Sequence, residues 1–183
     1  MREMDTKKTL LEEAKEKFSD LTDTEDDFFT DIEKKETFRK INELAVPSKN
    51  LPTIRAKCLS WLFQKSRIFR KIDSKSIIII QGVHIEGDIN CDNIILAKML
   101  QFSGCYFSGK INLFQSEMSS ITFEYSVVQG NIYAQHAAIK KSFSFINGSE
   151  SHGCIFLVEA HIGGSLVFTG SIVGKEHEAT AIN

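Results

Sequence analysis

The chain has 183 residues, of which 42% are hydrophobic and 25% are charged, and its formal net charge is −2. These values are typical of a globular protein and exclude a wholly disordered or collagen-like chain. The longest strongly apolar run, Ile77–Ile80, is far shorter than the ~20 residues that a membrane-spanning helix needs. The first residues are charged and do not predict a secretory signal.

Residue types are distributed unevenly along the chain. All 11 glycines lie at or after Gly82, whereas every arginine lies before Lys71. Residues 1–50 carry a net charge of −4, residues 51–75 carry +6, and residues 76–183 carry −4. We therefore predict three parts in this order: an N-terminal helical segment, a basic capping helix with its linker, and a repeat domain.

The first part is predicted to contain two amphipathic helices. Residues 6–20 place apolar side chains at helical spacing between charged ones. Thr22 and Glu25 have the spacing of a capping box, which predicts a second helix over about 24–45. Beyond the two prolines, a third helix is predicted over about 52–66.

The third helix and the linker after it are strongly basic. One interpretation is that the apolar face of the helix covers the end of the next domain while its charges are solvated. The other is that the basic side chains bind an anionic membrane surface or a phosphate group. The residues of this candidate membrane or phosphate patch are Arg55, Lys57, Lys65, Arg67, Arg70 and Lys71.

From Ile78 onward one pattern recurs nine times: apolar, any, apolar, any, any, small, any, apolar. The units start at residues 78, 89, 100, 111, 121, 132, 143, 155 and 166. An 11-residue repeat can also be helical, but glycines, β-branched residues and apolar pairs two positions apart favour strands. Two units, about 22 residues, would then form one coil of a β-solenoid.

Two kinds of small residue recur in these units. Glycines two positions before a unit start predict corners with unusual φ or close backbone approach. They are Gly87, Gly109, Gly130, Gly153 and Gly164. The small position inside each unit predicts a column of like residues along the axis. Its members are Cys105, Ser116, Ser126, Ala137, Gly148, Ala160 and Ser171. In the seventh unit Glu150 replaces the last apolar residue, and residues 147–152 are predicted to bulge as a loop.

Three segments, residues 82–89, 100–107 and 160–170, resemble bacterial pentapeptide-repeat-like β-helix proteins. Some members of that family carry the description "membrane-associated oxidoreductase". The helix at 54–62 also resembles the one that leads into such a coil, so that the resemblance covers roughly 54–183. It implies an α+β chain in which N-terminal helices precede a right-handed quadrilateral β-helix with about 11 residues per half-coil.

The residues do not predict catalytic or cofactor-binding groups. The four cysteines are far apart in sequence, which argues against a disulfide framework, a zinc knuckle or a redox pair and predicts buried reduced thiols. No GxGxxG motif opens a helix after a strand. The best candidate metal pair is His136 with His161, expected on one face, one coil or about 5 Å apart. Because no third ligand is predicted, we expect no metal site.

We therefore expect a non-catalytic scaffold or protein-interaction module, located in the cytoplasm, with no cofactor and no nucleic-acid partner. One alternative is a peripheral protein at the inner face of the membrane with the nominal oxidoreductase activity. The other, implied by the resemblance, is an acidic DNA mimic that inhibits topoisomerases. Residues after Val173 look like the opening of another half-coil. The end of the solenoid is thus expected to be open, either as part of a longer protein or as an end-to-end homodimer interface.

Overall fold

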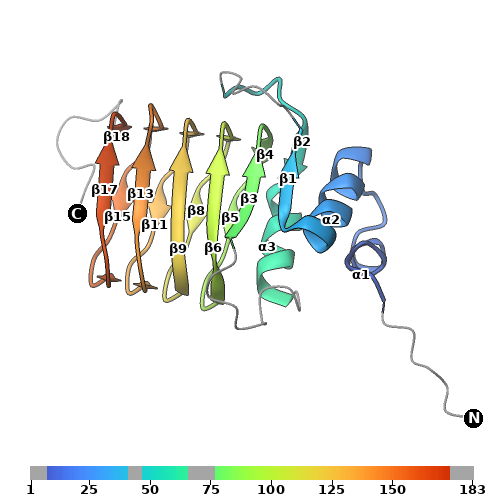
Figure 1. Cartoon of the computed structure of the whole chain (residues 1–183), viewed down its shortest axis with the longest axis horizontal. Helices are drawn as coiled ribbons and strands as arrows, with labels where there is room; N and C mark the ends of the chain where they lie inside the picture. Colours follow the sequence, from blue (N-terminus) through green and yellow to red (C-terminus); the bar gives the residue numbers. More distant parts are fainter. Residues whose placement is uncertain (1–7, 41–46, 66–76, 174–183) are drawn as a thin grey trace, which may run out of the picture.

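The computed structural model describes residues 8–40, 47–65 and 77–173. In these ranges three helices are followed by a parallel β-solenoid of about four turns (Figure 1). The coil is right-handed, which is the usual hand of a connection between parallel strands. The predicted α+β class and the order of its two parts are confirmed.

Helices α1 (Leu10–Lys17) and α2 (Asp23–Lys35) both begin with capping boxes. In α2, the predicted pair is present: the Thr22 hydroxyl accepts from the Glu25 N–H at 3.3 Å, and the Glu25 carboxylate accepts from the Thr22 N–H at 3.0 Å. The same arrangement, which the sequence reading missed, opens α1 at Thr9. Each box satisfies backbone N–H groups that have no partner inside the helix.

The second helix is shorter than predicted. It ends at Lys35, the cap residue Glu36 has a left-handed φ of 54°, and the chain continues as strand β1 (Thr37–Arg39). Strand β1 pairs in parallel with β3 (Ile77–Gln81), so Phe38 is a buried strand residue and not part of a helix. At residues 37–39, the hydrogen bonds to the first coil determine the structure more strongly than the helical spacing of the apolar residues. The rest of the predicted helix falls on residues 41–46, outside the described ranges.

The third helix, α3 (Ala56–Lys65), starts later than predicted because Thr53–Arg55 form strand β2. Strand β2 pairs with β4 (His84–Glu86), and β1 and β2 therefore each add a strand to a sheet of the solenoid. In Figure 1 the helices lie at the N-terminal end of the rod. One hydrophobic core runs from α1 into the coils, across the predicted boundaries at residues 50 and 75.

Three parallel sheets form the sides of the coil. Sheet A contains β1, β3, β6 (Ile95–Ser103), β9 (Glu117–Glu124), β12 (Ala138–Ile139), β13 (Phe143–Ile146), β16 (His161–Ile162) and β17 (Leu166–Thr169). Sheet B contains β2, β4, β7 (Tyr106–Phe107), β10 (Val127–Val128), β14 (Glu150–Ser151) and β18 (Ile172–Val173). Sheet C contains β5 (Ile89–Asn90), β8 (Ile111–Asn112), β11 (Ile132–Tyr133) and β15 (Ile155–Phe156). Sheet A supplies two of four sides, because the two halves of β9 pair with β12 and with β13.

The register of the strands is the one that the repeat predicts. Leu100 pairs with Ile78 on one side and Ile121 on the other, and Phe143 pairs with Ile121 and Leu166. Alternate unit starts therefore stack directly, and one coil takes 21 to 23 residues. Inside sheet A the stacking builds a ladder of rings: the Phe102 and Phe123 centroids lie 5.6 Å apart, and those of Phe123 and Phe145 lie 4.5 Å apart.

The small residues form two columns and not one, because alternate units lie on different sides of the coil. In one column, Ser126 Oγ accepts from the Cys105 N–H, and Ser149 Oγ accepts from the Ser126 N–H, both at 3.1 Å. The predicted member Gly148 is instead exposed, and Ser149 takes the buried position. The predicted loop at 147–152 is also wrong. The turn at residues 147 and 148, where both φ angles are positive, absorbs the extra residue, and β14 then pairs normally.

The predicted glycine corners show both expected features. Gly87 has a φ of +91°. At Gly109 and Gly130 the neighbouring coil approaches so closely that a Cβ atom would lie 2.4 Å from Gly87 O and 2.6 Å from Lys110 N, respectively. The close stacking of coils at this corner therefore depends on residues without a side chain.

We expect Gly130→Ala to reduce the free energy of unfolding by about 1–3 kcal/mol, because the new methyl group would overlap the backbone of the preceding coil. The matched control is Gly148→Asn. There the nearest atom to a Cβ is 4.0 Å away, and asparagine tolerates the left-handed backbone, so the loss should stay within about 1 kcal/mol. Urea denaturation followed by circular dichroism measures both, and equal losses would contradict the steric explanation.

Candidate functional site

The outer face of sheet C changes character along the rod. Its strands bury alternate side chains, so that Asn90, Asn112, Tyr133 and Phe156 occupy one outward column in successive coils. Asn112 Nδ2 donates to Asn90 Oδ1 at 3.2 Å. The next two coils carry stacked rings, with the Tyr133 and Phe156 centroids 5.2 Å apart and an interplanar angle of 7°. Along this outward column, a pair of hydrogen-bonded amides is thus followed by a pair of stacked aromatic rings.

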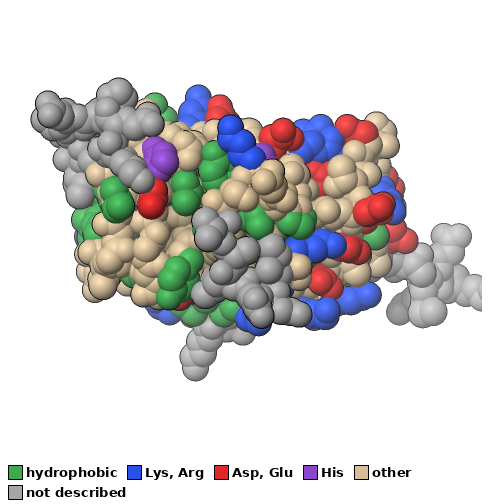
Figure 2. Space-filling view, turned by 90° about the horizontal axis from the view of Figure 1, so that it is seen from above, with side chains coloured by type: hydrophobic (Ala, Val, Ile, Leu, Met, Phe, Trp, Pro, Cys, Tyr) green, Lys and Arg blue, Asp and Glu red, His purple; other side chains and the backbone are tan. Residues whose placement is uncertain are grey.

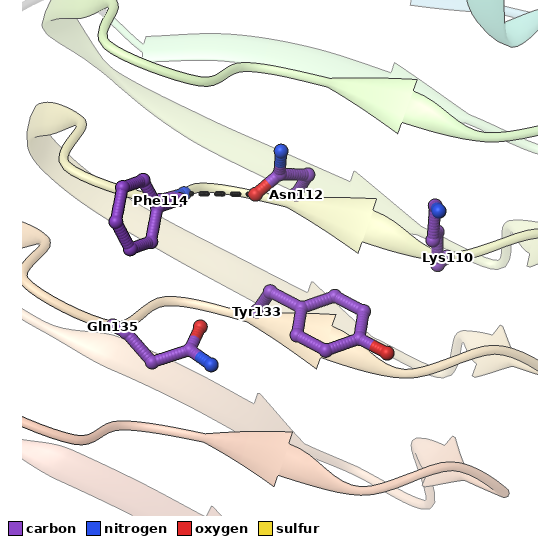
Figure 3. Close-up of a pocket in the computed structure, with 5 residues that line it drawn as sticks. All are labelled: Lys110, Asn112, Phe114, Tyr133 and Gln135. Atoms are coloured by element: carbon purple, nitrogen blue, oxygen red, sulfur yellow. Dashed lines mark hydrogen bonds between the residues drawn. The ribbon is translucent and has the colours of Figure 1, made fainter.

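A groove of about 310 Å³ lies on this face, between the coils of β8 and β11 (Figure 3). Lys110, Asn112 and Phe114 line it from one coil, and Tyr133 and Gln135 line it from the next. Figure 3 shows the Tyr133 ring lying along its strand and the side-chain oxygen of Gln135 directed toward the coil that carries Asn112 and Phe114. The groove therefore offers partly exposed rings beside amide groups.

The polar atoms of the groove differ in how far their hydrogen bonds are satisfied. Asn112 Oδ1 accepts from the Phe114 N–H at 3.1 Å and stays committed to its turn. The Tyr133 hydroxyl oxygen accepts from Asn131 Nδ2 at 2.9 Å, which leaves its own proton to donate. Gln135 Oε1 is buried and has no hydrogen-bond partner within the described part of the chain. Lys110 Nζ lies 3.7 Å from the Asp88 carboxylate, so its charge has a counter-ion.

The candidate metal pair, His136 with His161, does not occupy equivalent positions in successive coils. His136 sits at a left-handed corner with a φ of 57°, where its Nδ1 lies 3.1 Å from Glu159 Oε2 and its ring meets Phe114 edge to face. His161 lies in β16, in register with Ala138 two positions beyond His136. The two histidines therefore occupy different positions of the coil. Among residues 8–40, 47–65 and 77–173, no three His, Cys, Asp or Glu side chains gather closely enough for a metal ion.

The two described members of the basic patch serve the junction between helices and solenoid. The Arg55 guanidinium donates to Glu25 at 2.6 and 2.8 Å and to Asp20 at 2.6 Å. Lys57 Nζ lies 5.6 Å above the Phe18 ring and 4.0 Å from Asp20. The Lys65 side chain and Arg67, Arg70 and Lys71 lie outside what the structure describes. A membrane or phosphate role for the patch stays a prediction that rests on those residues.

Glu25 is the buried centre of that junction, with no solvent exposure. Besides the Arg55 guanidinium, its carboxylate accepts from the backbone N–H groups of Arg55 and Thr22 and from Cys58 Sγ. Burial alone would raise the pKa of this carboxyl, but the hydrogen bonds outweigh it and lower the pKa to about 2. The sequence marked Glu25 only as a capping residue. Its ion pair, which joins α2 to β2, had no local sequence signal.

The cysteines fit the predicted buried, reduced thiols. Cys58, Cys91 and Cys105 are buried, Cys154 is partly buried, and all four are free. Burial raises the pKa of the Cys58 and Cys105 thiols to about 12, which suppresses the reactive thiolate.

None of the protein-family models, curated proteins or solved structures compared with the chain matches it. None of the three helices is long and apolar enough to cross a bilayer, within the part of the chain that was searched. The fold and the faces thus define a class: a right-handed β-solenoid repeat protein whose N-terminal end carries a packed helical cap.

We expect Glu25→Gln to reduce the free energy of unfolding at pH 7 by about 3–5 kcal/mol, because it leaves the Arg55 guanidinium without its buried partner. Asp20→Asn is the matched control. Asp20 binds the same guanidinium but its side chain is 65% exposed, so the loss should be several-fold smaller than that of Glu25→Gln. Urea titration of each variant measures the difference, and similar losses would remove Glu25 from the centre of the junction.

The same carboxylate predicts an acid dependence of stability. The pKa of Glu25 is about 2 in the folded chain against an ordinary value of 4.5, so the folded state favours the charged form. Its contribution, about 3 kcal/mol, should be fully present above pH 5 and should disappear as the pH falls toward 2. Unfolding free energies of the natural chain and Glu25→Gln, measured from pH 7 to pH 2, should therefore converge. Parallel curves would contradict the lowered pKa.

Proposed function

We propose that the chain is a non-catalytic scaffold of the pentapeptide-repeat-like type, which presents the outer faces of a rigid rod to a protein partner in the cytoplasm. The observation that supports this most directly is the ladder of sheet B. It runs through six parallel strands from β2 to β18, and each strand is in register with the next. Solenoids of this kind offer extended surfaces whose side chains are held at fixed spacing. Free cysteines suit a reducing compartment.

The outer face of sheet B does not favour the DNA-mimic alternative. Its outward positions in successive coils are His84, Tyr106, Val127, Glu150 and Ile172. A mimic of the phosphate backbone needs a line of carboxylates, and this column contains one. In Figure 2 the charged side chains gather over the helical end, while the coils show mostly uncharged groups. This face is better suited to contacts with a protein.

The last described coil supports a second part of the proposal, namely that copies pair end to end. Within residues 77–173 no strand covers the outer edges of β15 and β18. Leu166 and Ile172 in this coil are 43% and 47% exposed. Open strand edges with exposed apolar side chains pair readily with another chain, and a two-fold related copy brings an identical edge.

We expect the natural chain to dimerise with rising concentration and Ile172→Lys to stay monomeric, because a lysine on an edge strand opposes strand pairing. Ile95→Lys is the matched control, since Ile95 is 65% exposed but lies in β6, far from this end. Light scattering after size-exclusion chromatography measures the mass. A monomer at all concentrations, or equal effects of both variants, would reject end-to-end pairing.

Photo-crosslinking in cells tests the scaffold proposal. A photoreactive residue replaces, one at a time, Thr122 on sheet A, Val127 on sheet B and Tyr133 on sheet C. We expect a discrete protein adduct from one face only. The purified partner should then bind the purified chain, with affinity reduced about tenfold or more by an aspartate at that position. The absence of an adduct from every face would contradict a scaffold role.

A further inference from the structure

We propose that the groove on the outer face of sheet C binds a neutral saccharide chain. This goes beyond the scaffold role and does not depend on it. Three independent properties of the groove point to this ligand class: an aromatic platform, hydrogen-bonding groups with unused capacity beside it, and the balance of its charge.

The platform is made by rings on three consecutive coils. Phe114 comes from the first, and Tyr133 and Phe156 stack parallel to each other on the next two. All three rings are only partly buried, although the aromatic side chains of the solenoid core, such as Phe123, are fully covered. Aromatic side chains that gather, partly exposed, on one face are typical of a binding surface. A pyranose ring with equatorial substituents has a flat apolar face that can lie on such rings.

The polar groups of the groove suit hydroxyl groups in particular. Gln135 Oε1 is buried without a donor within the described residues, and such an atom is destabilising unless something donates to it. The Tyr133 hydroxyl already accepts from Asn131 and has a proton left to donate. A sugar hydroxyl both donates and accepts, so it can accept from Tyr133, and it can donate to Gln135 Oε1 once that side chain, which lines the groove, turns its covered oxygen outward. A purely apolar segment of a protein would leave both unpaired.

The charge of the groove favours a neutral ligand. Of the five side chains that line it, Lys110 alone is charged, and the Asp88 carboxylate lies 3.7 Å from its ammonium group. At the corner beside Gln135, the ring of His136 contacts the Glu159 carboxylate. Among the described residues, no uncompensated cation thus lines the groove, as a phosphate or a carboxylate ligand would need.

Cellohexaose is the probe, with an acidic hexamer of galacturonate as its comparison. Binding to the full chain is measured by isothermal titration calorimetry and by amide shifts in ¹⁵N-labelled protein. We expect cellohexaose to bind at least about tenfold more tightly than the acidic chain, and to shift the backbone amides of Phe114 and Gln135 more than those of the helical cap.

Three variants locate the contacts. Tyr133→Ala removes the platform and should weaken binding about tenfold or more, whereas Tyr133→Phe keeps the ring and should lose only a few-fold. Gln135→Leu should weaken binding while leaving the thermal midpoint equal or higher, because it removes an unpaired buried oxygen. The matched control is Tyr125→Asn, at an exposed tyrosine outside the groove whose left-handed backbone asparagine tolerates.

The outcomes of these experiments distinguish a failure of the saccharide assignment from a failure of the scaffold proposal. Absence of binding by cellohexaose at millimolar concentration, tighter binding of the acidic chain, or equal loss in Tyr133→Ala and Tyr125→Asn would each overturn the saccharide assignment. A protein adduct at Tyr133 in cells, together with no saccharide binding, would also overturn it while leaving the scaffold proposal intact.

Discussion

The whole molecule depends on the stacking of one coil on the next through parallel backbone hydrogen bonds. Because strands stack about 4.8 Å apart, each position of a coil meets its own equivalent in the neighbouring coils. This explains why like residues recur in columns: phenylalanine rings inside sheet A, hydroxyl groups at one corner, and glycine at another. The glycine corner sets the tightest limit, since a single Cβ at Gly109 would reach within 2.4 Å of the coil before it.

A stack of coils has two ends, and the helical segment covers the first. Strands β1 and β2 pair with β3 and β4, so that the first full coil has no open edge on those two sides. Glu25 and Arg55 then lock α2 to β2, and the buried Lys98 in β6 pairs with Glu36 at the end of the same helix. Charged pairs are costly to bury, and here they join segments that are distant in sequence. The helices are thus joined to the first coil by strand pairing, by a shared hydrophobic core and by buried ion pairs.

The repeat was predictable because stacked coils bring equivalent positions together, and similar residues therefore recur at a nearly constant spacing in the sequence. The unit starts from Ile78 to Leu166 gave the true register, and the glycine corners were placed correctly. The single extra residue before Ser149 was misplaced, because nothing local distinguishes a turn of two left-handed residues from a bulged loop. Strands β1 and β2 were missed for a related reason. Three-residue strands carry no periodicity, and only the first coil makes them strands.

The packing of the core does not determine the side chains on the outer faces, and for that reason these side chains carry the information about function. The identity of an inward residue is determined by the stacking of the core, but an outward side chain is held only by its neighbours in the coils before and after it. On sheet C those neighbours explain the Asn90–Asn112 pair and the ring stack at Tyr133, yet they leave the buried oxygen of Gln135 without a donor. Among the described residues few buried side-chain polar atoms lack a partner, and this oxygen is one of them. Its position beside partly exposed rings fits a hydroxyl-bearing ligand that completes the hydrogen bond once the side chain turns outward.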